Sequence, residues 1–133
     1  LLVVDEPTAG LDPEERIRFR NLLVELAAER TVLLSTHIVG DIEASCNRLA
    51  VLDRGRVVFS GKAAELAKIA QGRVWEISGP LPPSCKLLST RRQDDEIISR
   101  VLCQENPGGL ELKCTLEDGY MMLMERERYG QTV

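Results

Sequence analysis

The chain has 133 residues, of which 44% are hydrophobic and 29% are charged, and its formal net charge at pH 7 is -4. This length and composition fit one ordinary globular domain or two small ones, and they exclude a disordered chain. The acidic balance and the lack of a basic tail argue against nucleic-acid binding. No apolar run approaches the roughly 18 residues that span a bilayer, so we expect no direct membrane insertion.

The opening stretch combines an apolar run with two adjacent carboxylates. The run Leu1–Val4 predicts a strand that is buried on both faces, as in the interior of a parallel sheet. Ligands of open α/β sheets bind beyond the carboxyl ends of the strands, so Asp5 and Glu6 lie where a site is expected. Two neighbouring acids repel each other unless a cation or a reaction uses them. On these two residues alone, a solvated acidic turn is the simpler interpretation.

A helix is predicted next, followed by a second strand. Asp12 is a suitable N-cap, Pro13 suits the first helical position, and Glu15 completes a capping box. Apolar residues then recur at helical spacing and predict one buried stripe: Phe19, Leu22, Leu23, Leu26 and Ala27. Residues 31–35 predict a second buried strand, and the strand, helix, strand order implies a parallel crossover that brings the two strand ends together.

The remaining elements follow from local signals. A short helix is expected after His37, then a β-hairpin from residues 49–52 and 57–59, then a helix over about 62–70. Strands are predicted at 73–78, 86–92, 96–104 and 110–114, separated by Gly- and Pro-containing breaks. The segment 115–118 has capping-box form and opens a final helix, whose aromatic and sulfur-containing residues we expect to be core: Tyr120, Met121, Met122 and Met124.

The four cysteines do not form a recognisable metal or disulfide motif. They lack a C-x-x-C pair and a nearby histidine partner: Cys46, Cys85, Cys103 and Cys114. We therefore expect free thiols in a reducing cytosol.

The run LLVVDEPTAGLDP (residues 1–13) resembles the Walker B segment and D-loop of the ABC-type ATPases at every position. Ser35-Thr36-His37 resembles their H-loop, although a lone histidine is more often a surface or core residue. By this resemblance Asp5 helps to hold Mg²⁺, usually through water, and Glu6 acts as general base or positions the attacking water. His37 contacts the γ-phosphate and Glu6. The D-loop then faces a partner subunit across an ATP sandwich through Ala9, Gly10, Leu11 and Asp12.

The sequence after His37 is similar to transporter-type ABC subunits, which carry a hairpin like LAVLDRGRVVFSG and a helix like KAAELAK at this place. The segments Val74-Trp75-Glu76 and TLED are similar to the accessory C-terminal domain of ABC subunits of the exporter type. The expected fold class is α/β. Residues 1–72 are predicted to be the distal part of an ABC ATPase domain, with a P-loop NTPase parallel sheet and helices, and residues 73–133 a small α+β accessory domain.

The resemblance also implies a function. The complete ATP-binding subunit would bind ATP with Mg²⁺ and hydrolyse it to drive transport through a transmembrane permease. It would work with a second ATP-binding subunit, as a homodimer, in the cytoplasm at the inner face of the membrane. A Walker A loop, a signature motif and a Q-loop are absent from the 133 residues, and the chain starts in mid-strand without Met. We therefore interpret the chain as a C-terminal fragment that begins at Walker B, holds no ATP or Mg²⁺ and is inactive alone.

Two alternatives stay open at this stage. One is a soluble ABC-type ATPase of repair, chromosome maintenance or translation, against which the hairpin argues. The other is a non-catalytic module in which residues 73–133 supply dimerisation or regulation.

Overall fold

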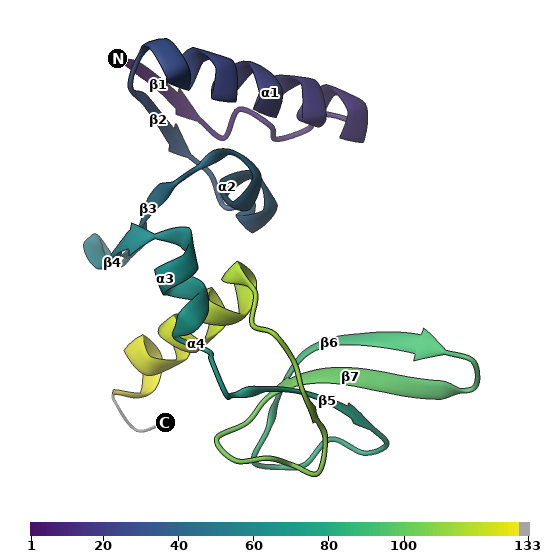
Figure 1. Cartoon of the computed structure of the whole chain (residues 1–133). Coiled ribbons are helices and arrows are strands. Elements are labelled where there is room, and N and C mark those ends of the chain that lie inside the picture. The colour runs from purple at the N-terminus through teal and green to yellow at the C-terminus, as the bar shows by residue number, and fades with distance from the viewer. Residues whose placement is uncertain (131–133) are drawn as a thin grey trace.

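A computed structural model describes residues 1–130 and contains both helices and strands (Figure 1). The structure confirms a mixed α/β composition. The elements in chain order are β1 (Leu2–Asp5), α1 (Pro13–Glu29), β2 (Val32–Ser35), α2 (Val39–Ser45), β3 (Arg48–Asp53), β4 (Arg56–Lys62), α3 (Ala63–Lys68), β5 (Val74–Ser78), β6 (Lys86–Gln93), β7 (Glu96–Leu102), β8 (Leu110–Glu111) and α4 (Leu116–Tyr129). Within these described residues, every helix is too short or too polar to cross a membrane.

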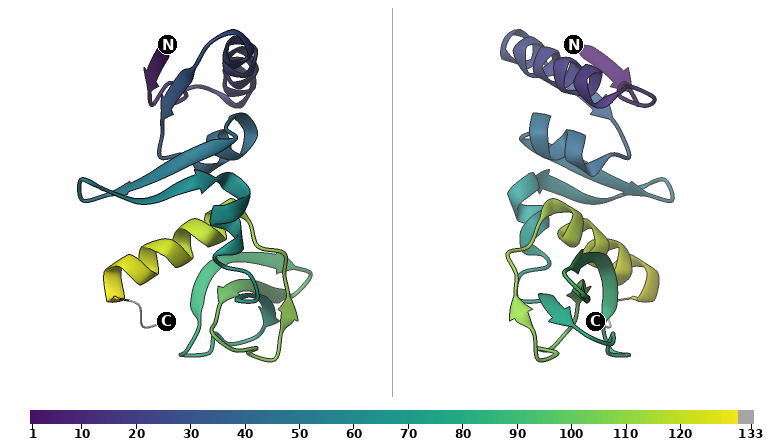
Figure 2. Two further views of the ribbon diagram at one scale, coloured as in Figure 1. Left: turned by 60° about the vertical axis from the view of Figure 1, so that its left-hand side comes forward. Right: turned by 90° about the vertical axis from the view of Figure 1, so that its right-hand side faces the viewer.

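Strands β1 and β2 form a parallel pair, as the strand, helix, strand order predicts. Helix α1 packs along one side of the pair (Figures 1 and 2). The prediction that both strands are buried on both faces is wrong for this structure, because Leu1, Val3 and Leu33 are 87%, 61% and 59% exposed. The physical reason is that a two-stranded sheet with one covering helix leaves its second face open.

Helix α1 begins as predicted and packs less fully than predicted. The Asp12 side chain accepts a hydrogen bond from the Glu15 N–H at 2.8 Å, and Glu15 Oε2 accepts one from the Asp12 N–H at 3.2 Å. This reciprocal pair is the expected capping box. Of the predicted apolar stripe, Leu23 is buried whereas Leu22 is 47% exposed. Only the part of the stripe that meets β2 and α2 is covered.

The middle of the molecule is built from the β3–β4 hairpin and the pair of helices α3 and α4. The hairpin is antiparallel, as predicted, with Arg54 and Gly55 at positive φ in its turn. One core cluster joins elements that are distant in sequence: Val51, Leu66, Leu116 and Leu123. A Cβ on Gly119 would lie 2.0 Å from the Leu66 carbonyl oxygen, so the glycine allows α4 to approach α3 closely.

The C-terminal sheet has the strand order β6-β7-β5-β8, with every pairing antiparallel. The predicted strands 73–78, 86–92 and 96–104 are confirmed to within a few residues, while the strand predicted at 110–114 is reduced to β8. Helix α4 and the turn after α3 cover one face of this sheet. Met122 of α4 and Ala70 of the turn pack there against Val74 and Leu102 of the strands, so Met122 has the expected core role. The last three residues of the predicted 73–133 domain lie outside the described range.

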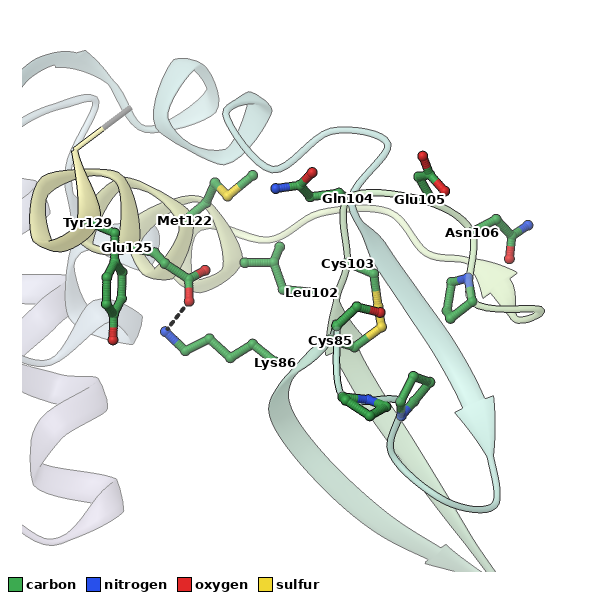
Figure 3. Close-up of a pocket in the computed structure, with 14 residues that line it drawn as sticks. Cys85, Lys86, Leu102, Cys103, Gln104, Glu105, Asn106, Met122, Glu125 and Tyr129 are labelled. Carbon is green, nitrogen blue, oxygen red and sulfur yellow. Dashed lines mark ion pairs between the residues drawn. A yellow bond between two sulfur atoms is a disulfide. The ribbon is translucent and has the colours of Figure 1, made fainter. Parts of the chain in front are cut away.

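The prediction of four free thiols is wrong for two of them. Cys85 and Cys103 form a disulfide, with their Cα atoms 4.6 Å apart (Figure 3), while Cys46 and Cys114 are free. Lys86 and Leu102 are register partners in the antiparallel β6–β7 pair. The two cysteines sit one residue beyond these partners and therefore face each other across the strands.

An ion pair fixes α4 to the sheet. Arg100 Nε lies 3.0 Å from Asp118 Oδ1, and Arg100 Nη2 donates to the Lys113 carbonyl oxygen at 2.9 Å. Burial alone would raise the pKa of Asp118, but hydrogen bonds from Arg100 and from Thr115 outweigh it and hold the pKa below its ordinary value. The hydrogen bond to Asp118 is the main reason that the pKa of Arg100 is raised.

Candidate functional site

The parallel register of β1 and β2 places the predicted site residues at one edge. Asp5 pairs with Ser35, and the ladder continues for one more residue because the Glu6 N–H donates to the Ser35 carbonyl oxygen at 2.8 Å. The side chains of Asp5, Glu6 and His37 therefore follow the carboxyl ends of two adjacent strands, which is where open α/β sheets place their ligands.

Glu6 and His37 are in direct contact. His37 Nδ1 lies 2.8 Å from Glu6 Oε2, and the Thr36 hydroxyl donates to the same carboxylate oxygen at 3.4 Å. The His37 side chain is 76% exposed and the Glu6 side chain 35%. Because Nδ1 faces Glu6 and the ring is largely exposed, the second ring nitrogen is open to a ligand from solvent. The Thr36 hydroxyl also accepts the Ile38 N–H at 3.0 Å, which fixes the turn into α2.

The segment after Glu6 is a tight turn. Glu6 itself has φ +46°, a left-handed conformation that costs a non-glycine residue about 1–2 kcal/mol. Such strain is concentrated at functional sites, where the surrounding structure holds it. Hydrogen bonds from Ala9 N–H to the Glu6 carbonyl and from Leu11 N–H to the Thr8 carbonyl close two successive turns. Ala9, Gly10 and Asp12 are exposed, so this turn forms a free surface that leads directly into α1.

A buried polar cluster lies behind the turn, and the sequence analysis did not predict it. The Thr8 hydroxyl donates to Asp41 Oδ2, and both residues are only 1% exposed. Arg20 of α1 lies 3.8 Å from Asp41 Oδ1 and donates to the Gly40 carbonyl at 3.4 Å. Burial, and to a smaller extent the Asp41 carboxylate, raises the pKa of the Cys46 thiol at the end of α2. The only signal in the sequence is that Thr8 and Asp41 each closely follow a predicted site residue.

A hollow of about 780 Å³ lies elsewhere, in the C-terminal part of the chain (Figure 3). It is bordered by the Cys85–Cys103 disulfide, by the Lys86–Glu125 ion pair at 3.3 Å and by Met122. None of the predicted site residues lines it. The chemistry-bearing groups Asp5, Glu6 and His37 are thus gathered on an open edge at the N-terminal end of the molecule.

Known proteins resemble this chain over half of its length or more. It is 34% identical over 145 aligned positions to the Nod factor export ATP-binding protein I of Rhizobium leguminosarum bv. viciae, covering 96% of this chain and 47% of that protein. The protein of the same name from Cupriavidus metallidurans is 46% identical over 67 residues, which is 50% of this chain and 22% of that protein. An uncharacterized ABC transporter ATP-binding protein of Nostoc is 42% identical over 67 residues, which is 50% of this chain and 20% of that protein.

The chain spans less than half the length of each of these relatives, at 47%, 22% and 20%. No protein-family model matches it. The relatives confirm the resemblance on which the sequence analysis relied: the chain is homologous to ABC transporter ATP-binding proteins.

Proposed function

We propose that the complete protein is an ATP-binding subunit that binds and hydrolyses ATP and so drives transport through a membrane permease. One observation carries the proposal: the Glu6–His37 contact of 2.8 Å at the ends of two parallel strands, in a chain homologous to ABC transporter ATP-binding proteins. A carboxylate and an imidazole at the carboxyl edge of a parallel sheet suit phosphoryl transfer, which depends on positioning and charge stabilisation.

Glu6 and His37 have different roles in the proposed hydrolysis. The Glu6 carboxylate accepts a hydrogen bond from the attacking water and orients it, or takes its proton as a general base. His37, held through Nδ1 by Glu6, presents its second ring nitrogen to an oxygen of the γ-phosphate. Because the same imidazole touches both groups, the pair also senses whether the γ-phosphate is present.

The residues fit Mg²⁺ as the accompanying ion. Mg²⁺ retains several waters and is held by one or two carboxylates together with the phosphates of the nucleotide. Asp5 and Glu6 offer adjacent hard oxygen donors of this kind, and Asp5 is exposed at the strand end. The described residues hold no group of three or more acidic, histidine or cysteine side chains arranged for a metal. When bound, Mg²⁺ supplies neutralisation of the phosphate charge.

The exposed turn and the two-part organisation complete the proposal. Ala9, Gly10, Leu11 and Asp12 contact a second ATP-binding subunit, and a homodimer is the simplest assembly. Residues 1–72 belong to a P-loop NTPase sheet of the ABC type, in which β1 and β2 are neighbours, and residues 73–133 are the accessory domain. The complete subunit works in the cytoplasm, at the inner face of the membrane, through its permease. The relative that matches over 96% of this chain is named for export, and we propose an exporter.

The 133 residues alone are expected to lack the ATP binding proposed for the complete subunit. They contain no phosphate-binding loop of the form G-x-x-x-x-G-K-[ST], whose backbone N–H groups and lysine grip the phosphates. We expect no ATP binding by these residues in isolation, which calorimetric titration with MgATP can check. Saturable binding that Asp5→Asn abolishes would contradict this part of the proposal.

The test of the activity uses the complete subunit together with its permease. Glu6→Gln keeps the size of the side chain and removes its charge, and it is expected to lower the hydrolysis rate by about 10²–10⁴-fold while ATP binding persists. Glu25→Gln, on the exposed side of α1, is the matched control and is expected to leave the rate unchanged. An unchanged hydrolysis rate in the Glu6→Gln protein would reject the proposed role.

A further inference from the structure

The Glu6–His37 contact must be held in place by structure outside the two side chains, because the His37 ring is largely exposed. The His37 side chain is 76% exposed, so packing of the ring does not determine where it lies. Its position must come from the backbone on either side, which is β2 before it and α2 after it. Glu6 is in the same situation, because it occupies a left-handed turn between β1 and the segment that leads to α1.

The buried cluster behind the turn ties these two backbones together. Thr8 follows Glu6 by two residues, and Asp41 follows His37 by four, in the first turn of α2. The Thr8 hydroxyl donates to Asp41 Oδ2, and both residues are 1% exposed. This hydrogen bond joins residues that are 33 positions apart in sequence. Together with the Glu6–His37 contact, it closes a small ring that runs through residues 6–8 and 37–41.

Burying the Asp41 carboxylate costs free energy, and this cost suggests that the cluster serves to position other residues. A buried carboxylate loses its hydration, and Asp41 recovers one hydrogen bond from Thr8 and an ion pair of 3.8 Å with Arg20, while Asp41 Oδ1 has no hydrogen bond among the described residues. Arg20 also donates to the Gly40 carbonyl at 3.4 Å and so connects α1 to the start of α2. An apolar pair at positions 8 and 41 would pack the same space without this cost.

We propose that Thr8 and Asp41 are positioning residues that hold Glu6 and His37 in contact. The inference rests on the proposed function for its catalytic meaning, because the pair matters only if Glu6 and His37 serve ATP hydrolysis. The contact itself, however, belongs to this chain and is measurable in it without any nucleotide.

The measurement uses the state of the His37 ring. His37 is the only histidine, so its ¹⁵N and ¹³C ring signals are unambiguous. In the neutral imidazole, the Glu6 contact favours the tautomer that carries the proton on Nδ1. The Glu6→Gln chain serves as the reference, because it shows the His37 ring signals in the absence of the charged Glu6 carboxylate.

Thr8→Val replaces the hydroxyl by a methyl group of similar size, and the Nδ1–H tautomer is expected to lose its enrichment. Thr8→Ser keeps a hydroxyl and is expected to restore the original signals. Thr115→Val is the control for general destabilisation, because it removes another threonine–aspartate hydrogen bond, the part-buried one to Asp118 in the α4 cap, without touching the site. Its His37 signals should match those of the original chain.

Two outcomes would overturn the proposal: a folded Thr8→Val chain that keeps the Nδ1–H enrichment, or a Thr115→Val chain that loses it equally. If Thr8→Val unfolds β1 and β2, Asp41→Asn becomes the deciding variant. It keeps the side-chain size and weakens both contacts, so a smaller loss of enrichment is expected, and no loss would reject the proposal. An inactive complete subunit with an intact His37 tautomer would reject the proposed function instead.

Discussion

Replacing Gly119 by alanine tests the packing of the middle of the molecule. In an ordinary helix, Gly→Ala stabilises by about 1 kcal/mol. Here the new Cβ would lie 2.0 Å from the Leu66 carbonyl oxygen and 2.8 Å from the Ala67 Cα, so α3 and α4 would have to separate by more than an ångström to reach ordinary contact. Separation weakens the core cluster around Leu66, Leu116 and Leu123. Overpacking of this kind costs about 1–3 kcal/mol and outweighs the gain in helix propensity.

Gly40 offers the matched control. It also lies in a helix, but a Cβ built on it meets nothing within 4 Å, so Gly40→Ala is expected to stabilise by up to about 1 kcal/mol. Urea unfolding followed by Trp75 fluorescence and by far-UV circular dichroism compares the two variants. Trp75 is the only tryptophan and lies in β5. A Gly119→Ala chain with a higher unfolding midpoint than the parent chain would refute the steric reasoning.

Three further predictions concern stability. Because the pKa of Asp118 is lowered in the folded state, its contribution is complete above its ordinary pKa of about 4 and is lost as the pH falls through the folded value. Denaturation midpoints should therefore fall more steeply with acidification in the original chain than in Asp118→Asn, and parallel curves would count against the Arg100 contact. Cys85→Ser removes a cross-link across 18 positions and is expected to cost about 3 kcal/mol in a comparison of urea unfolding. Thiol counting on the unfolded, unreduced original chain should give two free thiols, and four would show that Cys85 and Cys103 do not pair. Asp12→Ala removes the α1 cap and should cost about 0.5–2 kcal/mol by thermal unfolding, whereas Asp12→Asn should cost little, and an equal loss in both would argue against capping.

Local sequence signals predicted most of the elements correctly. The capping boxes at Asp12 and Thr115 and the hairpin turn at Arg54-Gly55 all depend on residues a few positions apart. The parallel pairing of β1 with β2 follows from the connection between them. The contact between Glu6 and His37 is one consequence of this register.

Apart from the shortened strand at 110–114, the errors concern contacts between residues that are distant in sequence. The Cys85–Cys103 disulfide depends on the register of β6 against β7, which spacing alone does not reveal. The Thr8–Asp41 hydrogen bond joins two polar residues that follow no hydrophobic period. The exposure of Val3 depends on how many elements cover the sheet, whereas the apolar pattern of the strand indicates only that burial is favourable.

The central claim is that Glu6 and His37 form one functional unit, and a double-mutant cycle on the complete subunit tests it most directly. Hydrolysis rates are measured for Glu6→Gln, for His37→Ala and for the double variant under saturating MgATP. Groups that act as a unit are strongly non-additive, so the double variant is expected to be about as slow as the slower single variant. Losses that multiply, or a His37→Ala protein with the original rate, would contradict the account.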